Sequence, residues 1–202
     1  MGSDPALVDR LDRHGVEIIE TLAALAHRHD QARAFENARV HHPGAAIQFG
    51  EAGAKPVHEV FDAVADPQQL SEYFTTGGAK GRLETGATVT WDFHDFPGAF
   101  PVHVVEVVPD LRIVLRWQAN EGEASNLEGG EMKEADYETT VTMTFKGLDD
   151  GRTLVEIAEE GWRLNEGALQ ASYGNCQGWT GMLLALKVWL EHGFNLREGL
   201  YT

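Results

Sequence analysis

The stretch SYGNCQGWTGMLLALKVWLEHG, residues 172–193, decides the fold. Its apolar residues recur every three or four positions, which predicts a long helix from about Ser172 to His192 with Gly193 as its C-cap. The stripe comprises Cys176, Trp179, Leu183, Leu186 and Leu190, with Met182 and Trp189 flanking it. A helix with so wide an apolar face has to be nearly covered by a concave partner, and a bent β-sheet is the partner that the rest of the chain offers.

The segments that would form this sheet lie between Gly77 and residue 158. Apolar and polar residues alternate there with a period of two, which is typical of antiparallel strands packed on one side. Turn-forming residues separate the alternating segments and predict connections at 85–86, 96–98, 109–110 and 149–152. The predicted strands lie at about 88–94, 103–108, 112–118, 137–146 and 154–158.

Other segments complete the predicted order of elements. Residues 45–51 are expected to form a first strand, and residues 56–64 and 67–74 two short helices, each with proline near its first turn. Residues 4–35 carry a helical stripe, so residues 1–40 are predicted to be an N-terminal helical extension of a domain at 45–202. Residues 119–136 are rich in glutamate and glycine and predict a long acidic loop.

Composition limits the classes of partner. Thirty-two acidic residues against 16 basic ones give a net charge of −16, which disfavours binding to nucleic acid and to anionic membrane surfaces. A single cysteine cannot form an intrachain disulfide, as expected of a protein in a reducing cytoplasm. The first residues lack the pattern of a signal peptide, and no segment has the length of apolar sequence that a membrane span requires. We therefore expect a cytoplasmic protein.

Several short motifs, in a fixed order, resemble those of the SRPBCC superfamily of START-like and birch-allergen-like proteins, in particular homologues of the activator of the heat-shock-protein-90 ATPase. The resemblance covers roughly residues 45–193. It rests on PVHEVFDA at 56–63, Asp66-Pro67, Leu70, Tyr73-Phe74, Gly86, Val104-x-Glu106-Val107-x-Pro109, Leu115-x-Trp117, Gly151-x-Thr153 and Gly178-Trp179.

This resemblance implies an α+β helix-grip fold, in which a curved antiparallel sheet wraps around a long C-terminal helix, here with an extra N-terminal helix. It also implies a hydrophobic cavity between sheet and helix. Members of the superfamily include ligand carriers, polyketide cyclases, chaperone regulators and uncharacterised proteins, so the fold narrows function very little.

The predicted cavity wall is mostly apolar, as the site of a small hydrophobic ligand would be. The alternative is that the same side chains simply fill the core. The residues expected to point inward are Trp91, Phe93, His103, Val105, Leu115, Trp117, Tyr137, Val141 and Met143 from the sheet, and Trp179, Met182 and Leu183 from the helix.

His103 and Tyr137 are the candidate catalytic residues. An inward imidazole on an apolar strand could orient a ligand or act as a general base near neutral pH, whereas the alternative for His103 is a solvated strand-end histidine. Tyr137 could donate its hydroxyl, or be an ordinary tyrosine with a buried ring. The remaining histidines lack the spacing of a zinc site, so we expect no metal and no cofactor.

Three functions follow as hypotheses. The first is binding of a small hydrophobic or aromatic molecule in the cavity. The second is a polyketide cyclase or dehydratase-like enzyme, a lyase without metal, using His103 and Tyr137. The third is a module that binds and regulates a chaperone. The stripe at residues 4–35 would also suit a homodimer contact. The sequence leaves the ligand, the existence of catalysis and the oligomeric state open.

Overall fold

The computed structural model describes residues 47–53, 55–94, 96–121 and 134–197. These residues lie within the domain predicted at 45–202, whose boundaries stay a prediction. The predicted N-terminal helix and residues 122–133 of the predicted acidic loop lie outside the described residues.

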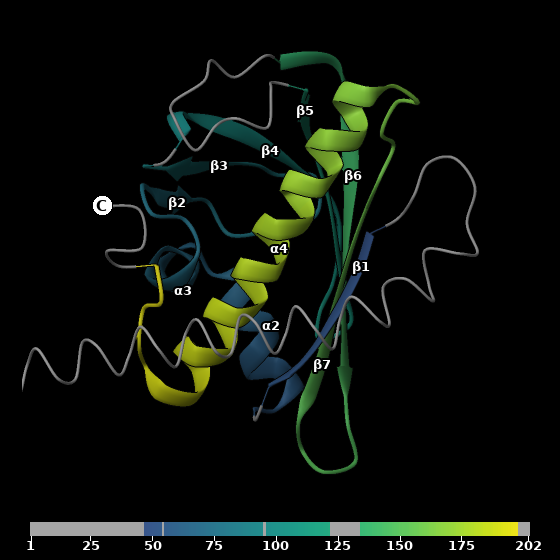
Figure 1. Cartoon of the computed structure of the whole chain (residues 1–202). Helices are drawn as coiled ribbons and strands as arrows, with labels where there is room; N and C mark the ends of the chain where they lie inside the picture. The colour runs from purple at the N-terminus through teal and green to yellow at the C-terminus, as the bar shows by residue number, and fades with distance from the viewer. Residues whose placement is uncertain (1–46, 54, 95, 122–133, 198–202) are drawn as a thin grey trace, which may run out of the picture. The chain divides into compact units, whose positions relative to one another are not determined.

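One antiparallel sheet of seven strands forms the body of the domain (Figure 1). Its strand order is β1-β7-β6-β5-β4-β3-β2, so consecutive strands are neighbours except that β1 pairs with β7. The strands are β1 (Ile47–Gly53), β2 (Gly78–Lys80), β3 (Thr88–Phe93), β4 (Phe96–Val108), β5 (Arg112–Asn120), β6 (Glu134–Gly147) and β7 (Thr153–Glu160).

Three helices are described: α2 (Val57–Ala65), α3 (Pro67–Tyr73) and α4 (Glu166–His192). Asp66 separates the first two, and its carboxylate accepts a hydrogen bond from the backbone N–H of Gln68 at 2.8 Å, as expected of an N-cap. α4 begins earlier than the sequence pattern predicts, because Asn165 caps it by accepting from the N–H of Ala168 at 2.7 Å. It ends where predicted, at Gly193, whose φ of 64° suits a glycine C-cap.

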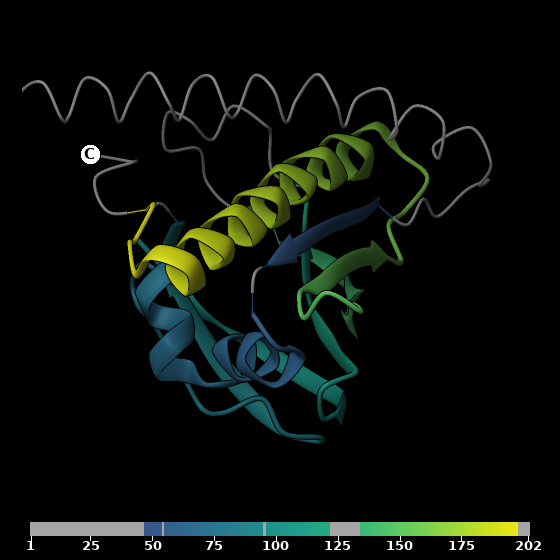
Figure 2. The same ribbon diagram turned by 90° about the horizontal axis from the view of Figure 1, so that it is seen from below.

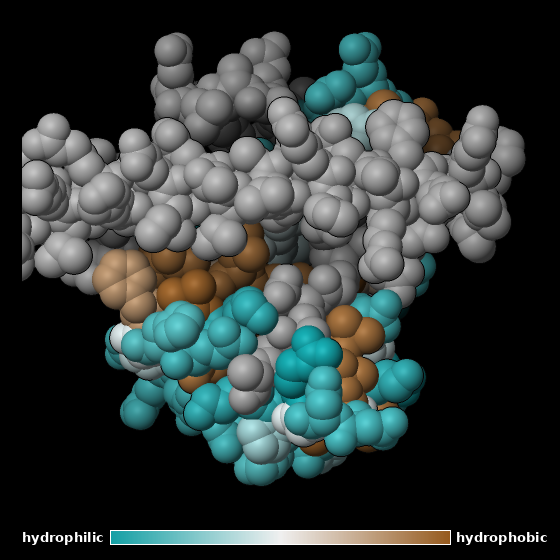
Figure 3. Space-filling view, turned by 60° about the horizontal axis from the view of Figure 1, so that its bottom comes forward, coloured by the Kyte–Doolittle hydropathy of each residue, from teal (hydrophilic) through white to brown (hydrophobic). Residues whose placement is uncertain are grey.

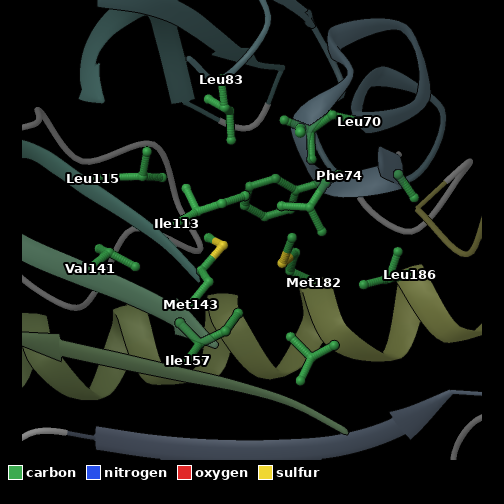
Figure 4. Close-up of a cluster of buried hydrophobic side chains, with 14 of the residues drawn as sticks. Leu70, Phe74, Leu83, Ile113, Leu115, Val141, Met143, Ile157, Met182 and Leu186 are labelled. Atoms are coloured by element: carbon green, nitrogen blue, oxygen red, sulfur yellow. The ribbon is translucent and has the colours of Figure 1, made fainter. Parts of the chain in front are cut away.

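α4 lies along the inner face of the curved sheet, as Figures 1 and 2 show from two directions. The side chains between these two layers are almost all apolar. Figure 4 shows Met143 of β6 and Met182 of α4 near the middle of this core, surrounded by leucine, isoleucine and valine side chains. This arrangement confirms the predicted α+β helix-grip fold for the described residues.

The prediction of which β4 side chains point toward the core is wrong over part of the strand. Val102 and Val104 are buried, whereas His103 is exposed and Val105 is 44% exposed. A β-bulge explains the error: Val104 lies opposite Leu115 and Glu106 opposite Val114, which leaves Val105 without a partner and reverses the alternation beyond it. Consequently Val107, beyond the bulge, is partly buried against the core.

The start of β4 also differs from the prediction. Residues 96–98, expected to be a turn, belong to the strand, and Phe96 pairs with Phe93 across the hairpin. Gly98 keeps a turn-like φ of 102° within the strand, which accounts for the turn signal in the sequence.

The outer surface of the described domain is mixed in character. Figure 3 shows hydrophilic side chains over much of one face, with hydrophobic ones gathered between them. None of the described helices has the length and apolar character needed to cross a membrane. The large apolar side chains that remain exposed are Val105, Leu111, Leu164, Leu169, Tyr173 and Phe194.

Candidate functional site

An aromatic cluster lies between the sheet and α4. Its rings come from the end of α3, from three neighbouring strands and from the helix. At its centre Trp117 of β5 and Trp179 of α4 are stacked, with ring centroids 5.2 Å apart and ring planes inclined by 26°. The aromatic cluster comprises Phe74, Trp91, Phe93, Phe100, Trp117 and Trp179.

Among the residues that the structure describes, one carboxylate is buried beside this cluster, that of Glu159 on β7, which is only 2% exposed. Both central tryptophans donate to it: Trp117 Nε1 lies 2.9 Å from Oε1, and Trp179 Nε1 lies 2.8 Å from Oε2. The hydroxyl of Thr139 donates to Oε1 at 2.6 Å. The amide nitrogen of Asn175 lies 3.1 Å from each carboxylate oxygen.

The spacing of residues along β7 and α4 explains why Glu159 and its hydrogen-bond partners point toward one another. On β7 the inner face runs through Thr153, Val155 and Ile157 and ends at Glu159, because alternate residues of a strand share a face. Thr139 holds a buried position on β6, the neighbouring strand. On α4, Asn175 and Trp179 are four residues apart and so project from one face of the helix.

The electrostatic environment of Glu159 is unusual, because its partners are all uncharged. Among the described residues no lysine, arginine or histidine forms an ion pair with it. Indole and amide N–H groups can only donate, which suits an ionised carboxylate. These hydrogen bonds offset the cost of burying the charge, although they leave it without a neutralising cation.

Trp91 contributes a second polar feature. Its side chain is 1% exposed, and within the part of the chain that the structure describes its indole N–H has no hydrogen-bond partner. The ring packs edge-to-face on Trp117, with centroids 5.9 Å apart. A buried donor without an acceptor is costly, so this N–H is available to a ligand that brings one.

Most of the residues predicted to line a cavity have the predicted orientation toward the interior. All of them are buried except Trp117, which is half-buried. Their participation in ligand binding stays a prediction. These residues are Trp91, Phe93, Leu115, Trp117, Val141, Met143, Trp179, Met182 and Leu183.

His103 has the opposite orientation from the one predicted. Its side chain lies on the outer face of the sheet, where Nδ1 is 3.1 Å from the hydroxyl of Thr88 and Nε2 is 3.7 Å from a carboxylate oxygen of Glu138. The imidazole is therefore separated from the aromatic cluster by the sheet itself.

Tyr137 lies on the inner face but belongs to a second, smaller cluster with Ala119, Trp162 and Ala168. The guanidinium of Arg163 lies 4.4 Å from the centre of its ring. Partial burial is the main cause that raises the pKa of the Tyr137 hydroxyl, and a hydrogen bond with Glu121 raises it further. Since His103 and Tyr137 occupy opposite faces of the sheet, the structure does not assemble them into one acid–base pair.

The described residues offer few other candidates for metal binding or for a reactive side chain. Among the described residues, no three histidine, cysteine, aspartate or glutamate side chains converge in a way that could hold a metal ion. The thiol of Cys176 is half-buried on α4, and this burial raises its pKa.

The sequence analysis missed Glu159, Thr139 and Asn175 as site residues. A signal existed for the first of them: the alternation of Val155 and Ile157 continues to position 159, which places a glutamate on an apolar face. Asn175 lies one helical turn before Trp179, on the stripe that faces the sheet. A polar residue that falls on an apolar face is more informative than another aromatic one.

Comparison with known proteins places the chain in context. The family model for Activator of Hsp90 ATPase homolog 1-like proteins matches residues 54–191. No curated protein matches the chain significantly.

The solved structures that resemble the domain include the following three. The protein SSP2350 from Staphylococcus saprophyticus is 23% identical, with a TM-score of 0.59 over 76% of this chain and 96% of its own. DynU16, from the dynemicin biosynthetic locus, is 24% identical, with a TM-score of 0.58 over 75% of this chain and 49% of its own. The Aha1 dimer from Colwellia psychrerythraea is 15% identical, with a TM-score of 0.55 over 74% and 98%. At these identities the likeness concerns the fold alone.

Proposed function

The chain belongs to the family of Activator of Hsp90 ATPase homolog 1-like proteins, and we propose that it binds a small hydrophobic or aromatic molecule between its sheet and α4. Membership of this family, with the matching folds, also confirms the resemblance to the SRPBCC superfamily predicted from the sequence. The family and the fold by themselves do not specify a ligand.

The observation that carries the proposal is the contact of Trp117 and Trp179 with the buried carboxylate of Glu159. A purely structural core has little use for a charged group, since burying it costs several kcal/mol before its hydrogen bonds are counted. Sites for small molecules, in contrast, combine apolar and aromatic walls with a few fixed polar groups. The aromatic cluster around Glu159 has this composition.

Exposure of the cluster indicates how a ligand would reach it. Trp117, Phe100 and Asn175 are each half-buried, whereas Glu159 beneath them is almost fully covered. A ring that enters beside Trp117 and Trp179 would extend the existing stack. Stacking between aromatic rings is favourable by about 0.5–1.5 kcal/mol beyond the burial of area.

The unsatisfied N–H of Trp91 supports the same location. It is buried next to Trp117, and it lacks an acceptor within the described residues. A ligand that brings a carbonyl, ether or hydroxyl oxygen to this N–H would remove the cost of leaving it unpaired, which is about 1–3 kcal/mol.

The other two hypotheses have less support. The cyclase or dehydratase hypothesis relied on His103 and Tyr137, which lie on opposite faces of the sheet. The chaperone-regulating module and the homodimer stay proposals: the Colwellia protein is described as a dimer, but only its fold can be transferred to this chain.

Calorimetric titration with naphthylmethanol, a neutral bicyclic alcohol, tests the proposal. We expect saturable binding to the wild-type protein and affinity reduced about tenfold in Trp117→Phe, since the smaller ring loses part of the stack and the hydrogen bond to Glu159. Trp189→Phe is the matched control, because Trp189 is also a half-buried tryptophan but lies outside the aromatic cluster. Equal affinities of the two variants would contradict the proposal.

A further inference from the structure

We propose that the ligand carries a positive charge, as an aromatic or alicyclic amine whose ammonium group is held by Glu159. This inference rests on the proposed function and specifies the chemical class of the ligand. It starts from the buried negative charge and the absence of a cationic partner for it among the described residues.

The charge balance of the site gives the first argument. Glu159 is 2% exposed, and its partners are the N–H and O–H groups of Trp117, Trp179, Thr139 and Asn175. Hydrogen bonds from neutral donors stabilise the carboxylate but do not cancel its charge. An ammonium group brought by a ligand would form a charge-assisted hydrogen bond in a site of low dielectric, where such bonds are about twice as strong as neutral ones.

The geometry of Asn175 gives the second argument. Its amide nitrogen is shared between Oε1 and Oε2 at 3.1 Å each, which are the longest contacts made to the carboxylate. The tryptophan and threonine donors lie closer, at 2.6–2.9 Å. Because Asn175 is half-buried, rotation of its side chain would uncover one side of both oxygens. An ammonium group has three donors and could then span the two oxygens in its place.

The aromatic surroundings give the third argument. Trp117 and Trp179 are stacked on each other, and both direct their N–H edges toward Glu159. The carboxylate therefore lies at the edges of the two indole rings, next to the aromatic surface that they form. An amine held by Glu159 through its ammonium group could place its own ring against this surface, so the site combines a negative charge with an apolar, aromatic wall.

The net charge of the whole chain also favours a cationic ligand. Its net charge of −16 attracts cations and repels anions over distances of about a Debye length. An anionic ligand would be repelled both by this field and by the buried carboxylate. The inference thus excludes carboxylates and phosphates as ligands and ranks neutral molecules below amines.

Three probes of nearly the same shape test the inference: naphthylmethylamine, naphthylmethanol and naphthoate. Calorimetric titration of the wild-type full chain should give the amine at least about tenfold tighter binding than the alcohol, and the weakest binding for the carboxylate. The titrations are made at a salt concentration that screens exposed charges, so that attraction by the surface does not produce the difference.

Two matched variants test whether Glu159 is the carboxylate that binds the ammonium group. Glu159→Gln keeps the size of the side chain and should abolish the preference for the amine while the alcohol still binds. Glu160→Gln, at the adjacent exposed position, removes one negative charge as well and should leave the preference unchanged. The wild-type comparison of amine with alcohol decides the inference even where Glu159→Gln fails to fold.

The outcomes distinguish the inference from the proposed function. If the alcohol binds and the amine binds no more tightly, or if the amine preference survives in folded Glu159→Gln, the inference is overturned and the proposed function stands. If none of the three probes binds, both are overturned.

Discussion

Trp179 on the long helix donates its indole N–H to the buried carboxylate of Glu159 on β7, at 2.8 Å. This hydrogen bond ties α4 to the sheet at a point where the contacts between the two layers are otherwise mainly apolar. Apolar contacts fix how closely a helix and a sheet approach, whereas a polar contact between fixed groups also favours one position of the helix along the sheet. Glu159 thus links the helix to the sheet, and in the proposed function the same carboxylate also lies beside the ligand.

Replacement of Glu159 by leucine tests the first of these roles. The substitution would leave the buried donors of Trp179 and Thr139 without their acceptor, and each unsatisfied donor costs about 1–3 kcal/mol. We expect the free energy of unfolding to fall by roughly 2–5 kcal/mol, measured by urea denaturation. Glu160→Leu, at an exposed position, serves as the control and should change it by less than about 0.5 kcal/mol. A Glu159→Leu protein as stable as the wild type would show that these hydrogen bonds do not support the fold.

The buried hydroxyl of Tyr73 makes stability depend on alkaline pH. It donates to the carbonyl of Ala63 at 3.2 Å, and burial raises its pKa well above the ordinary value. Because the folded pKa is the higher one, the stabilisation is fully present below the pKa of an unfolded tyrosine, about 10, and is lost as the pH rises above it. We expect the urea midpoint of the wild type to fall between pH 9 and pH 11, roughly the range over which free tyrosine ionises.

Tyr73→Phe should flatten this alkaline decline, since phenylalanine has no proton to lose. Tyr173→Phe is the control, because Tyr173 is 56% exposed and should leave the slope as it is in the wild type. Identical slopes for wild type and Tyr73→Phe would argue against a buried hydroxyl.

The thiol of Cys176 should react slowly in the folded protein. Burial raises its pKa, and the thiolate is the reactive form. We expect the rate of alkylation by iodoacetamide, followed by mass spectrometry, to rise at a higher pH in the folded chain than in the chain unfolded by urea. Coincident pH profiles for the two states would contradict the described environment of Cys176.

His103 should be dispensable for ligand binding. Its imidazole lies on the outer face of the sheet beside Thr88 and Glu138, and so has no contact with the aromatic cluster. His103→Ala is expected to bind naphthylmethanol with the affinity of the wild type in a calorimetric titration. A loss of affinity comparable to that of Trp117→Phe would mean that the site extends through this part of β4.

The sequence predicted the layers of the fold better than the details within them. The apolar stripe through Trp179, Leu183 and Leu186 identified the long helix, because burial of so wide a face leaves few alternatives. The start of that helix was placed too late, at Ser172. Before Trp179 only Ala168 and Ser172 of this helix are buried, so its first turns carry little apolar stripe, and the cap at Asn165 depends on one hydrogen bond.

The face of β4 was misassigned for a different reason. Between Val102 and Val108, valines stand at both odd and even positions and therefore on both faces of a regular strand. The pattern alone could not decide which of them are buried. The bulge at Val105 then reverses the alternation within the strand, and only the pairing with β5 reveals it. The inward assignment of His103 followed from this ambiguity.

The polar part of the site was hidden because its members are far apart in the sequence. Trp117 and Glu159 are 42 residues apart, and although Trp117 belongs to the motif Leu115-x-Trp117, Glu159 belongs to none of the motifs that carry the family resemblance. Their contact depends on the strand order β7-β6-β5, which places the two side chains on the same inner face with Thr139 between them. The aromatic wall, in contrast, could be predicted from hydrophobicity and alternation alone.

Nuclear magnetic resonance of the indole N–H groups tests the central claim most directly. The chain has five tryptophans, all within the described residues, so each indole signal can be assigned by single substitution. On titration with naphthylmethanol, the signals of Trp117 and Trp179 should shift together and saturate, while those of Trp162 and Trp189 stay in place. Shifts confined to Trp162 or Trp189, or no shift at Trp117 and Trp179, would contradict ligand binding beside Glu159.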